Sequence, residues 1–213
     1  QFKTGMMGEG VLGYDEMNMS QSIVNHTTGS RAGTILVNET VATQGQATIT
    51  LDGLTSTTTV TVGDVFTIAN VFAVNPQTRL STGSLQQFVV TAAQTASGGD
   101  MANMAISPPM YTAANALATI DAFPADNAAV TFVGTASTVY PQNLVYHKNA
   151  ITLATADLLL PQGVDMASRQ VHNGVSMRIV RQYDINNDRM PCRVDVLYGF
   201  NTIRAPMACR IWG

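Results

Sequence analysis

The stretch from Gly63 to Thr91 constrains the fold of this chain more strongly than any other. It contains a run of β-branched and aromatic residues, VFTIANVFAV, then an Asn75-Pro76 turn, a loop with a glycine, and a second apolar run ending in FVVT. Runs of this kind bounded by Gly, Pro and Asn are typical of strands joined by a short connection. The stretch shows no side chains arranged as in a catalytic site. It therefore predicts β-structure without chemistry of its own.

Short segments of the same character recur from Thr34 to Val133. Apolar and polar residues tend to alternate in them, which is the period of a strand with one buried face. The Asp52-Gly53 pair is expected to break the chain as a hairpin turn. Six strands are predicted, over residues 47–51, 58–62, 65–71, 85–92, 104–107 and 129–133. They are enough for a compact antiparallel barrel of roughly a hundred residues.

The chain changes character after Pro141. The segment that begins at Asn143 is predicted to form a short helix and then a buried strand, because Ile151 and Leu153 alternate and Pro161 excludes a longer helix. The expected fold class is therefore α+β, rich in β-structure.

A long β-hairpin is predicted near the carboxyl end. Apolar residues alternate over 175–179 and again over 190–200, with a polar turn at 184–189 between them. We expect the apolar face of this hairpin to be buried against the rest of the same domain, and Cys192 to lie in that core. Trp212 is expected to dock the end of the chain onto the core.

Charge is scarce and unevenly distributed. Charged residues make up 12% of the 213 residues and apolar residues 46%, and such a surface suits packing against other chains. Residues 1–31 carry a net charge of −1, residues 32–147 carry −5 and residues 148–213 carry +3, which gives −3 for the chain. The acidic middle, whose only base is Arg79, is typical of an inserted module. The basic end contains too many acids to indicate specific nucleic-acid binding.

The run from Asp184 to Asp188 has the D-x-N-x-D spacing of a calcium-binding loop, and Asp195 falls at its twelfth position. Arg189 stands where such a loop needs glycine for its sharp turn, and Asp195 lies within a predicted strand. A hairpin turn is therefore the preferred interpretation.

The remaining candidates for chemistry are isolated from one another. His26, His147 and His172 belong to no metal-binding or catalytic motif, and Cys192 and Cys209 match no CxxC pattern. The two cysteines are either reduced or paired across neighbouring strands. No catalytic, cofactor-binding or metal-binding residue and no cofactor is predicted, and the protein is not expected to be an enzyme. The apolar runs are too short to cross a bilayer.

Several long runs carry a resemblance to a known family: Asn143–Asp165 (NLVYHKNAITLATADLLLPQGVD), Met177–Asn186 (MRIVRQYDIN), Arg193–Phe200 (RVDVLYGF) and Ala208–Gly213 (ACRIWG). These runs resemble the carboxyl-terminal half of the coat proteins of short-tailed phages related to Salmonella phage P22. The Gly63–Thr91 stretch is similar to the β-domain inserted in those proteins. The resemblance covers nearly the whole chain.

That family has the capsid fold first described in phage HK97, with a telokin-like domain inserted in its axial domain. The resemblance implies an axial segment at residues 1–31, the inserted six-stranded antiparallel β-barrel at 32–140, a second axial segment at 141–190, and strands returning to the peripheral domain at 191–213. The arm, extended loop and spine helix of the family have no counterpart in this sequence. We therefore expect the natural protein to have a portion before Gln1.

The implied function is that of a major capsid protein, whose copies assemble as hexamers and pentamers into the icosahedral head of a tailed double-stranded DNA phage. Scaffolding and portal proteins are the further expected partners, with no membrane partner. Arg178 or Arg181 is a candidate for contact with packaged DNA without reading its sequence. The expected location is the virion, assembled in the cytoplasm of the host bacterium.

Two other classes of function also fit parts of the sequence. A β-rich surface adhesion or carbohydrate-binding module is an alternative, because strands rich in Thr, Asn and Gly with small acidic loops suit that role. A hydrolase that uses one of the three histidines is another.

Overall fold

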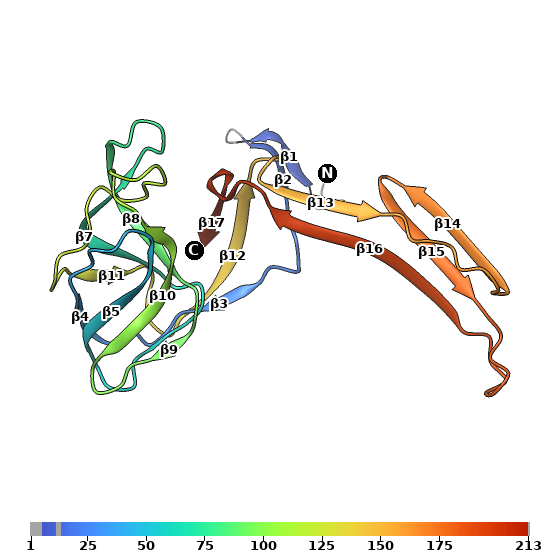
Figure 1. The fold of residues 1–213 in the computed structure, drawn as a ribbon, viewed down its shortest axis with the longest axis horizontal. Coiled ribbons are helices and arrows are strands. Elements are labelled where there is room, and N and C mark those ends of the chain that lie inside the picture. The colour runs from blue at the N-terminus through green and yellow to red at the C-terminus, as the bar shows by residue number, and fades with distance from the viewer. Residues whose placement is uncertain (1–5, 12–13, 213) are drawn as a thin grey trace. The chain divides into compact units, whose positions relative to one another are not determined.

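The computed structural model describes residues 6–11 and 14–212 and is built almost wholly from β-strands (Figure 1). It divides into two units. The barrel unit comprises the residues up to Gln142 together with the end of the chain from Trp212, and the sheet unit comprises residues 143–211. Within the described residues the only helix is a 3-10 turn at Ala205–Met207. The β-rich class is thus confirmed, but no α-helix accompanies it there.

Six antiparallel strands form the main sheet of the barrel unit, in the order β11-β7-β8-β10-β5-β4. Their bounds are β4 (Gly33–Val37), β5 (Gln46–Leu54), β7 (Val65–Val74), β8 (Ser81–Val90), β10 (Met101–Met110) and β11 (Val130–Phe132). An antiparallel bridge between Leu36 and Ala129 brings the two edge strands together. The sheet is therefore a nearly closed barrel, which confirms the predicted architecture in outline.

The membership of this sheet differs from the predicted one. Residues 58–62 contribute only the short β6 (Thr59–Val60), which pairs with β9 (Gln94–Thr95) outside the main sheet. Its place is taken by β4, which the alternation pattern did not single out. The hairpin predicted at Asp52-Gly53 is wrong, because β5 runs through both residues.

Gly53 explains why a turn signal sits inside a strand. Its φ is +69°, and a Cβ atom added there would lie 2.0 Å from the carbonyl oxygen of Thr34 on the neighbouring strand. Only glycine allows this conformation and this close approach between two backbones. The residue therefore marks a local irregularity in the pairing of β4 with β5, and not the end of a strand.

The core of the barrel unit follows from alternation along its strands. In β5, Ile49 and Leu51 point inward and are fully buried. The ring of Phe66 stacks on that of Phe88 at 5.6 Å between centroids and lies 5.3 Å from that of Phe132. Burying such aromatic side chains provides much of the stability of a small barrel.

The other strands of the barrel unit precede and follow the barrel. β1 (Met6–Val11) pairs with β2 (Tyr14–Asn18). β3 (Asn25–Thr27) pairs with residues 139–141 at the start of β12 (Val139–Tyr146). We call these paired residues of β3 and β12 the stem. The short helix predicted from Asn143 is wrong, because β12 continues as a strand through that position.

The sheet unit is a single four-stranded antiparallel sheet in the order β13-β16-β15-β14. Its strands are β13 (Ile151–Ala156), β14 (Met166–His172), β15 (Val175–Arg181) and β16 (Cys192–Thr202). The strand predicted at Ile151 is present but is not buried, because Leu153 is 66% exposed. The predicted long hairpin is confirmed, whereas β14 was not predicted. The last strand, β17 (Ala208–Trp212), adjoins β12.

The apolar face of the long hairpin is exposed, so the prediction that it is buried is wrong. Phe200 is 76% exposed and Tyr198 is 63% exposed. Within residues 143–211 only Ala150 and Ser176 are buried. The reason is that the sheet unit has a single layer, and alternation specifies an apolar side without supplying anything to cover it.

Candidate functional site

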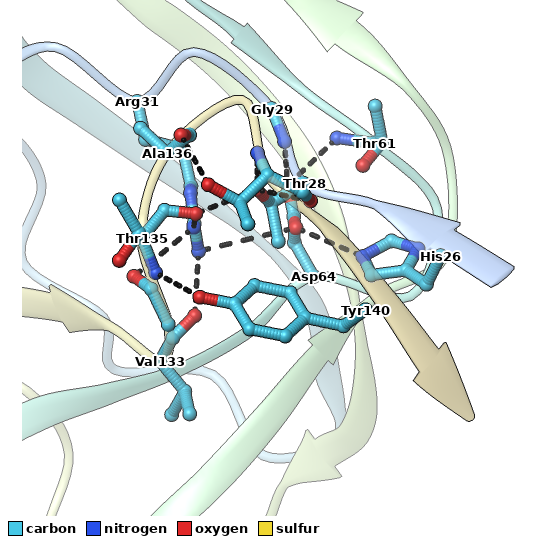
Figure 2. A network of polar contacts seen from close by, with 12 residues as sticks. His26, Thr28, Gly29, Arg31, Thr61, Asp64, Val133, Thr135, Ala136 and Tyr140 are labelled. Atoms are coloured by element: carbon cyan, nitrogen blue, oxygen red, sulfur yellow. Dashed lines mark hydrogen bonds and ion pairs between the residues drawn. The ribbon is translucent and has the colours of Figure 1, made fainter. Parts of the chain in front are cut away.

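A buried carboxylate lies where the stem joins the barrel (Figure 2). Asp64, directly before β7, is fully buried. Its Oδ2 atom accepts hydrogen bonds from the backbone N–H groups of Gly29 at 3.1 Å and Thr61 at 2.9 Å. Its Oδ1 atom lies 3.1 Å from Nε2 of His26, a residue of β3. The carboxylate thus joins a barrel loop to the segment that leads out of the stem.

Arg31 secures the other side of the same junction. Its guanidinium Nη1 lies 3.9 Å from Oδ1 of Asp64, and the group stands 5.4 Å from the ring centroid of Phe132. Its Nη atoms donate to the carbonyl oxygens of Val133, Gly134 and Thr135 at 2.8, 3.2 and 2.9 Å. Arginine suits this position because its planar group carries several donors in a fixed geometry. Arg31, which lies just before the first barrel strand, is thereby bonded to the segment that follows the last barrel strand.

Thr28 and Tyr140 complete the junction. The Thr28 hydroxyl donates to the carbonyl oxygen of Thr135 at 2.7 Å and accepts from the N–H of Thr138 at 3.0 Å. The Tyr140 hydroxyl accepts from the N–H of Thr135 at 2.8 Å, and its bonding to Thr135 holds the pKa of this phenol below its ordinary value. These bonds join the residues just before the barrel to the residues just after it.

Trp212 packs on the stem. Its ring lies 5.0 Å from that of Tyr140 and 5.8 Å from that of His26. The expected docking of this residue is therefore confirmed only as a contact with the stem.

The junction has the character of a structural tie. Its carboxylate is enclosed, and its oxygens already accept bonds from groups of the chain itself. His26 belongs to the barrel unit, whereas His147 and His172 belong to the sheet unit. The Nδ1 atom of His147 accepts from the N–H of Asn149 at 3.2 Å. In the part of the chain that the structure describes, no three His, Cys, Asp or Glu residues are grouped so that they could hold a metal ion.

The Asp184 loop is a turn, as preferred from the sequence. The N–H of Asp184 donates to the carbonyl oxygen of Arg189 at 2.8 Å. The Asp184 carboxylate accepts from the side chain of Asn187 and the N–H of Asn186, and these bonds hold its pKa below the ordinary value. The Tyr183 hydroxyl donates to Asp188, which raises the pKa of that phenol. The carboxylates of Asp184 and Asp188 therefore accept hydrogen bonds from residues of this turn or directly next to it.

The two arginines considered for DNA contact are both ion-paired. The guanidinium of Arg178 bonds the carboxylate of Asp195, with Nε at 3.2 Å from Oδ2. Arg178, and after it Arg193, hold the pKa of Asp195 below its ordinary value. Arg181 pairs with Asp165 at 2.8 Å. Their charges are therefore largely offset within the sheet unit.

A second candidate site is the exposed apolar side of the sheet unit, which we call the apolar face. Directly opposed residues of antiparallel strands point to the same side, and the register places Leu153 opposite Phe200 and Met177 opposite Val196. The members of the apolar face are Leu153, Met177, Val194, Val196, Tyr198 and Phe200, all of them exposed. Exposed apolar side chains gathered in this way mark surfaces that bind other protein.

Cys192 continues this side of β16 and is exposed, so its predicted place in a core is wrong. Cys209 is also exposed, and both thiols are free. Neither residue is joined to the other.

Sequence reasoning missed the central residue of the junction. Asp64 lies directly before the strand that the sequence predicted from Val65, and that strand is present. Nothing in the pattern indicated that its carboxylate is buried, or that His26 and Arg31, far away in sequence, would lie beside it. Long-range contacts of this kind leave no periodic signal.

Comparison with known proteins adds one finding. A protein-family model described as "P22 coat protein - gene protein 5" matches residues 1–212. No curated protein matches the sequence.

No helix within the described residues is long and apolar enough to span a bilayer.

Proposed function

Because this chain belongs to the P22 coat protein family, we propose that it is the major capsid protein of a tailed double-stranded DNA phage and assembles into an icosahedral head. Its role is structural: the protein makes a shell, and its surfaces serve to bind coat protein. Hexamers and pentamers of the chain would form this shell, in which every subunit is held by several neighbours and individually weak contacts add up.

The observation that supports this proposal most directly is the apolar face. A single sheet with Phe200 and Tyr198 exposed cannot stabilise itself as the barrel does, because removal of apolar area from water is the main favourable contribution to folding. In the assembled shell we expect coat protein to cover this face. The low content of charged residues, 12%, keeps repulsion between the packed copies small.

The same proposal includes the domain boundaries, the partners and the location of the protein. Residues 1–31 and 141–190 would form axial segments, 32–140 the inserted domain, and 191–213 strands of the peripheral domain. Acidic loops of the insertion would meet bases on a neighbouring capsomer, which makes assembly sensitive to salt. Scaffolding and portal proteins would be partners, and assembly would occur in the host cytoplasm before the protein resides in the virion. Ion pairing of Arg178 and Arg181 leaves them less charge for packaged DNA than the sequence alone indicated.

A matched pair of substitutions tests the role of the apolar face. Leu153, on that face, is 66% exposed, and Leu117, in a loop of the barrel unit, is 65% exposed. Leu153→Ser should sharply reduce the yield of closed shells seen by electron microscopy of the full protein, whereas Leu117→Ser should leave it near wild type. Equal shell yields from both variants would contradict the role of the apolar face. Wild-type protein that stays monomeric and binds glycans would instead support an adhesion module.

A further inference from the structure

The barrel and the stem are joined by polar contacts and not by a shared apolar core. Among the described residues, the buried apolar cluster of the barrel includes none from β3 or β12. Within β3 only His26 is partly covered. What holds the stem against the barrel is therefore the set of hydrogen bonds around Asp64 (Figure 2).

We infer that Asp64 is a positioning residue that fixes the inserted barrel on its stem. Among the described residues it is the only charged residue that is fully buried. One of its donors, the N–H of Thr61, comes from the barrel, whereas His26 and the N–H of Gly29 come from the stem and the segment that follows it. The inference concerns a single subunit and does not depend on the proposed function.

The chemistry of a buried carboxylate explains why it can act as such a tie. A carboxylate removed from water needs several donors, because an unpaired buried charge is strongly unfavourable. The barrel loop offers Asp64 only part of this set, and the set is completed when the stem segment docks. Each hydrogen bond to a charged group favours the docked position of the stem segment roughly tenfold to a hundredfold. Docking of the stem and burial of Asp64 are therefore coupled.

Close packing at Gly29 makes the docked position specific. A Cβ atom at this residue would lie 2.1 Å from the carbonyl oxygen of Thr59, so the segment approaches the barrel backbone as closely as glycine allows. The Ser30 hydroxyl accepts from the N–H of Thr59 at 2.8 Å, and the Thr61 hydroxyl donates to the carbonyl oxygen of Thr27 at 2.8 Å. These contacts align the segment, while Asp64 supplies the charged bonds at its centre.

Segment-resolved hydrogen exchange of the full chain tests the inference. Asp64→Asn keeps the shape of the side chain but removes its charge and turns one acceptor into a donor. We expect exchange about tenfold or more faster in residues 24–31 and 135–141, with barrel residues 86–90 at the wild-type rate. Asp126→Asn, a substitution of an exposed carboxylate elsewhere in the barrel unit, is the control and should change neither region.

A second variant keeps the test decisive if Asp64→Asn does not fold. His26 lies outside the barrel sheet, so His26→Ala should leave the barrel folded, with residues 86–90 at the wild-type rate. It should speed exchange in residues 24–31 and in residues 139–141, which pair with β3. Two results would overturn the inference. One is equal acceleration of the stem and barrel segments in the variant that folds, which would make Asp64 an ordinary fold residue. The other is unchanged exchange in the stem of His26→Ala.

Discussion

The barrel unit and the sheet unit are made from the same kinds of residue but use them in opposite ways. Almost all buried apolar side chains of the described residues lie in the barrel unit, and Ala150 is the only one in the sheet unit. The barrel curves round until its edge strands meet, so it covers one face of its own sheet. The sheet unit leaves an apolar face open. Alternation makes one side of a sheet apolar, but closure decides whether that side becomes a core or stays exposed.

The two units also handle charge differently. Asp64 in the barrel unit is enclosed and receives its donors from distant parts of the chain. Asp195 in the sheet unit is paired with arginines of its own and the neighbouring strand. The first arrangement joins distant segments of the chain, whereas the second pairs charges within one sheet.

The largest expected effect separates a core phenylalanine from an exposed phenylalanine. Phe88→Ala should destabilise the barrel by about 3–5 kcal/mol, because it removes a fully buried ring and leaves a cavity. Phe200→Ala should change the stability of the unassembled protein by less than about 0.5 kcal/mol, because its ring already lies in water. Urea unfolding followed by circular dichroism measures both. Equal losses would break the distinction between the two units.

Two glycine substitutions compare a glycine in a closely packed pair of strands with a glycine in an open turn. Gly53→Ala should cost about 2 kcal/mol or more, since the new methyl group collides with the backbone of Thr34 and φ is +69°. Gly174→Ala, in the turn between β14 and β15, has φ of +79° but meets no atom within 4 Å, so it should cost about 1 kcal/mol. Peptide-resolved exchange at increasing urea measures each unit. A larger cost at Gly174 would contradict the closely packed pairing of β4 and β5.

The ion pair of the sheet unit predicts a dependence on pH. Because arginines lower the pKa of Asp195 in the folded protein, the stabilisation is present above the pKa of the unfolded carboxyl, about 4, and is lost as the pH falls through the lowered folded value. Asp195→Asn should therefore be less stable than wild type at pH 7 and indistinguishable from it in stronger acid. The urea midpoint for peptides from residues 166–202 reports this. Asp165→Asn, at a more exposed ion pair, is the control and should show a smaller difference.

The smallest expected effect is confined to the exposed turn of the sheet unit. The hydrogen bond to Asp188 stabilises the neutral phenol of Tyr183 and raises its pKa above the ordinary 10.0. Asp188→Asn should bring this pKa back toward 10.0 without changing shell yield. Alkaline titration of the Tyr183 ring resonances by NMR measures the shift. An unchanged pKa would show that this bond does not persist in solution.

Part of the fold could be predicted from local pattern alone. The hairpin of β15 and β16 and the strands of the Gly63–Thr91 stretch could be predicted because apolar and polar residues alternate along a strand, and this alternation is visible in the sequence. The helix predicted at Asn143 failed because a short apolar run does not distinguish a helix turn from a strand. Gly53 was misplaced because glycine serves turns and close approaches alike.

Composition and alternation were enough to predict a protein that is rich in β-structure and low in charge, because both are local properties of the chain, and its long runs carried the resemblance to coat proteins. The burial of Asp64 beside His26 and Gly29, the place of β4 in the barrel and the exposure of Phe200 became known from the three-dimensional structure. Each of these depends on which distant segments meet. That choice reflects burial and hydrogen bonding summed over the whole fold, which no short stretch of residues encodes.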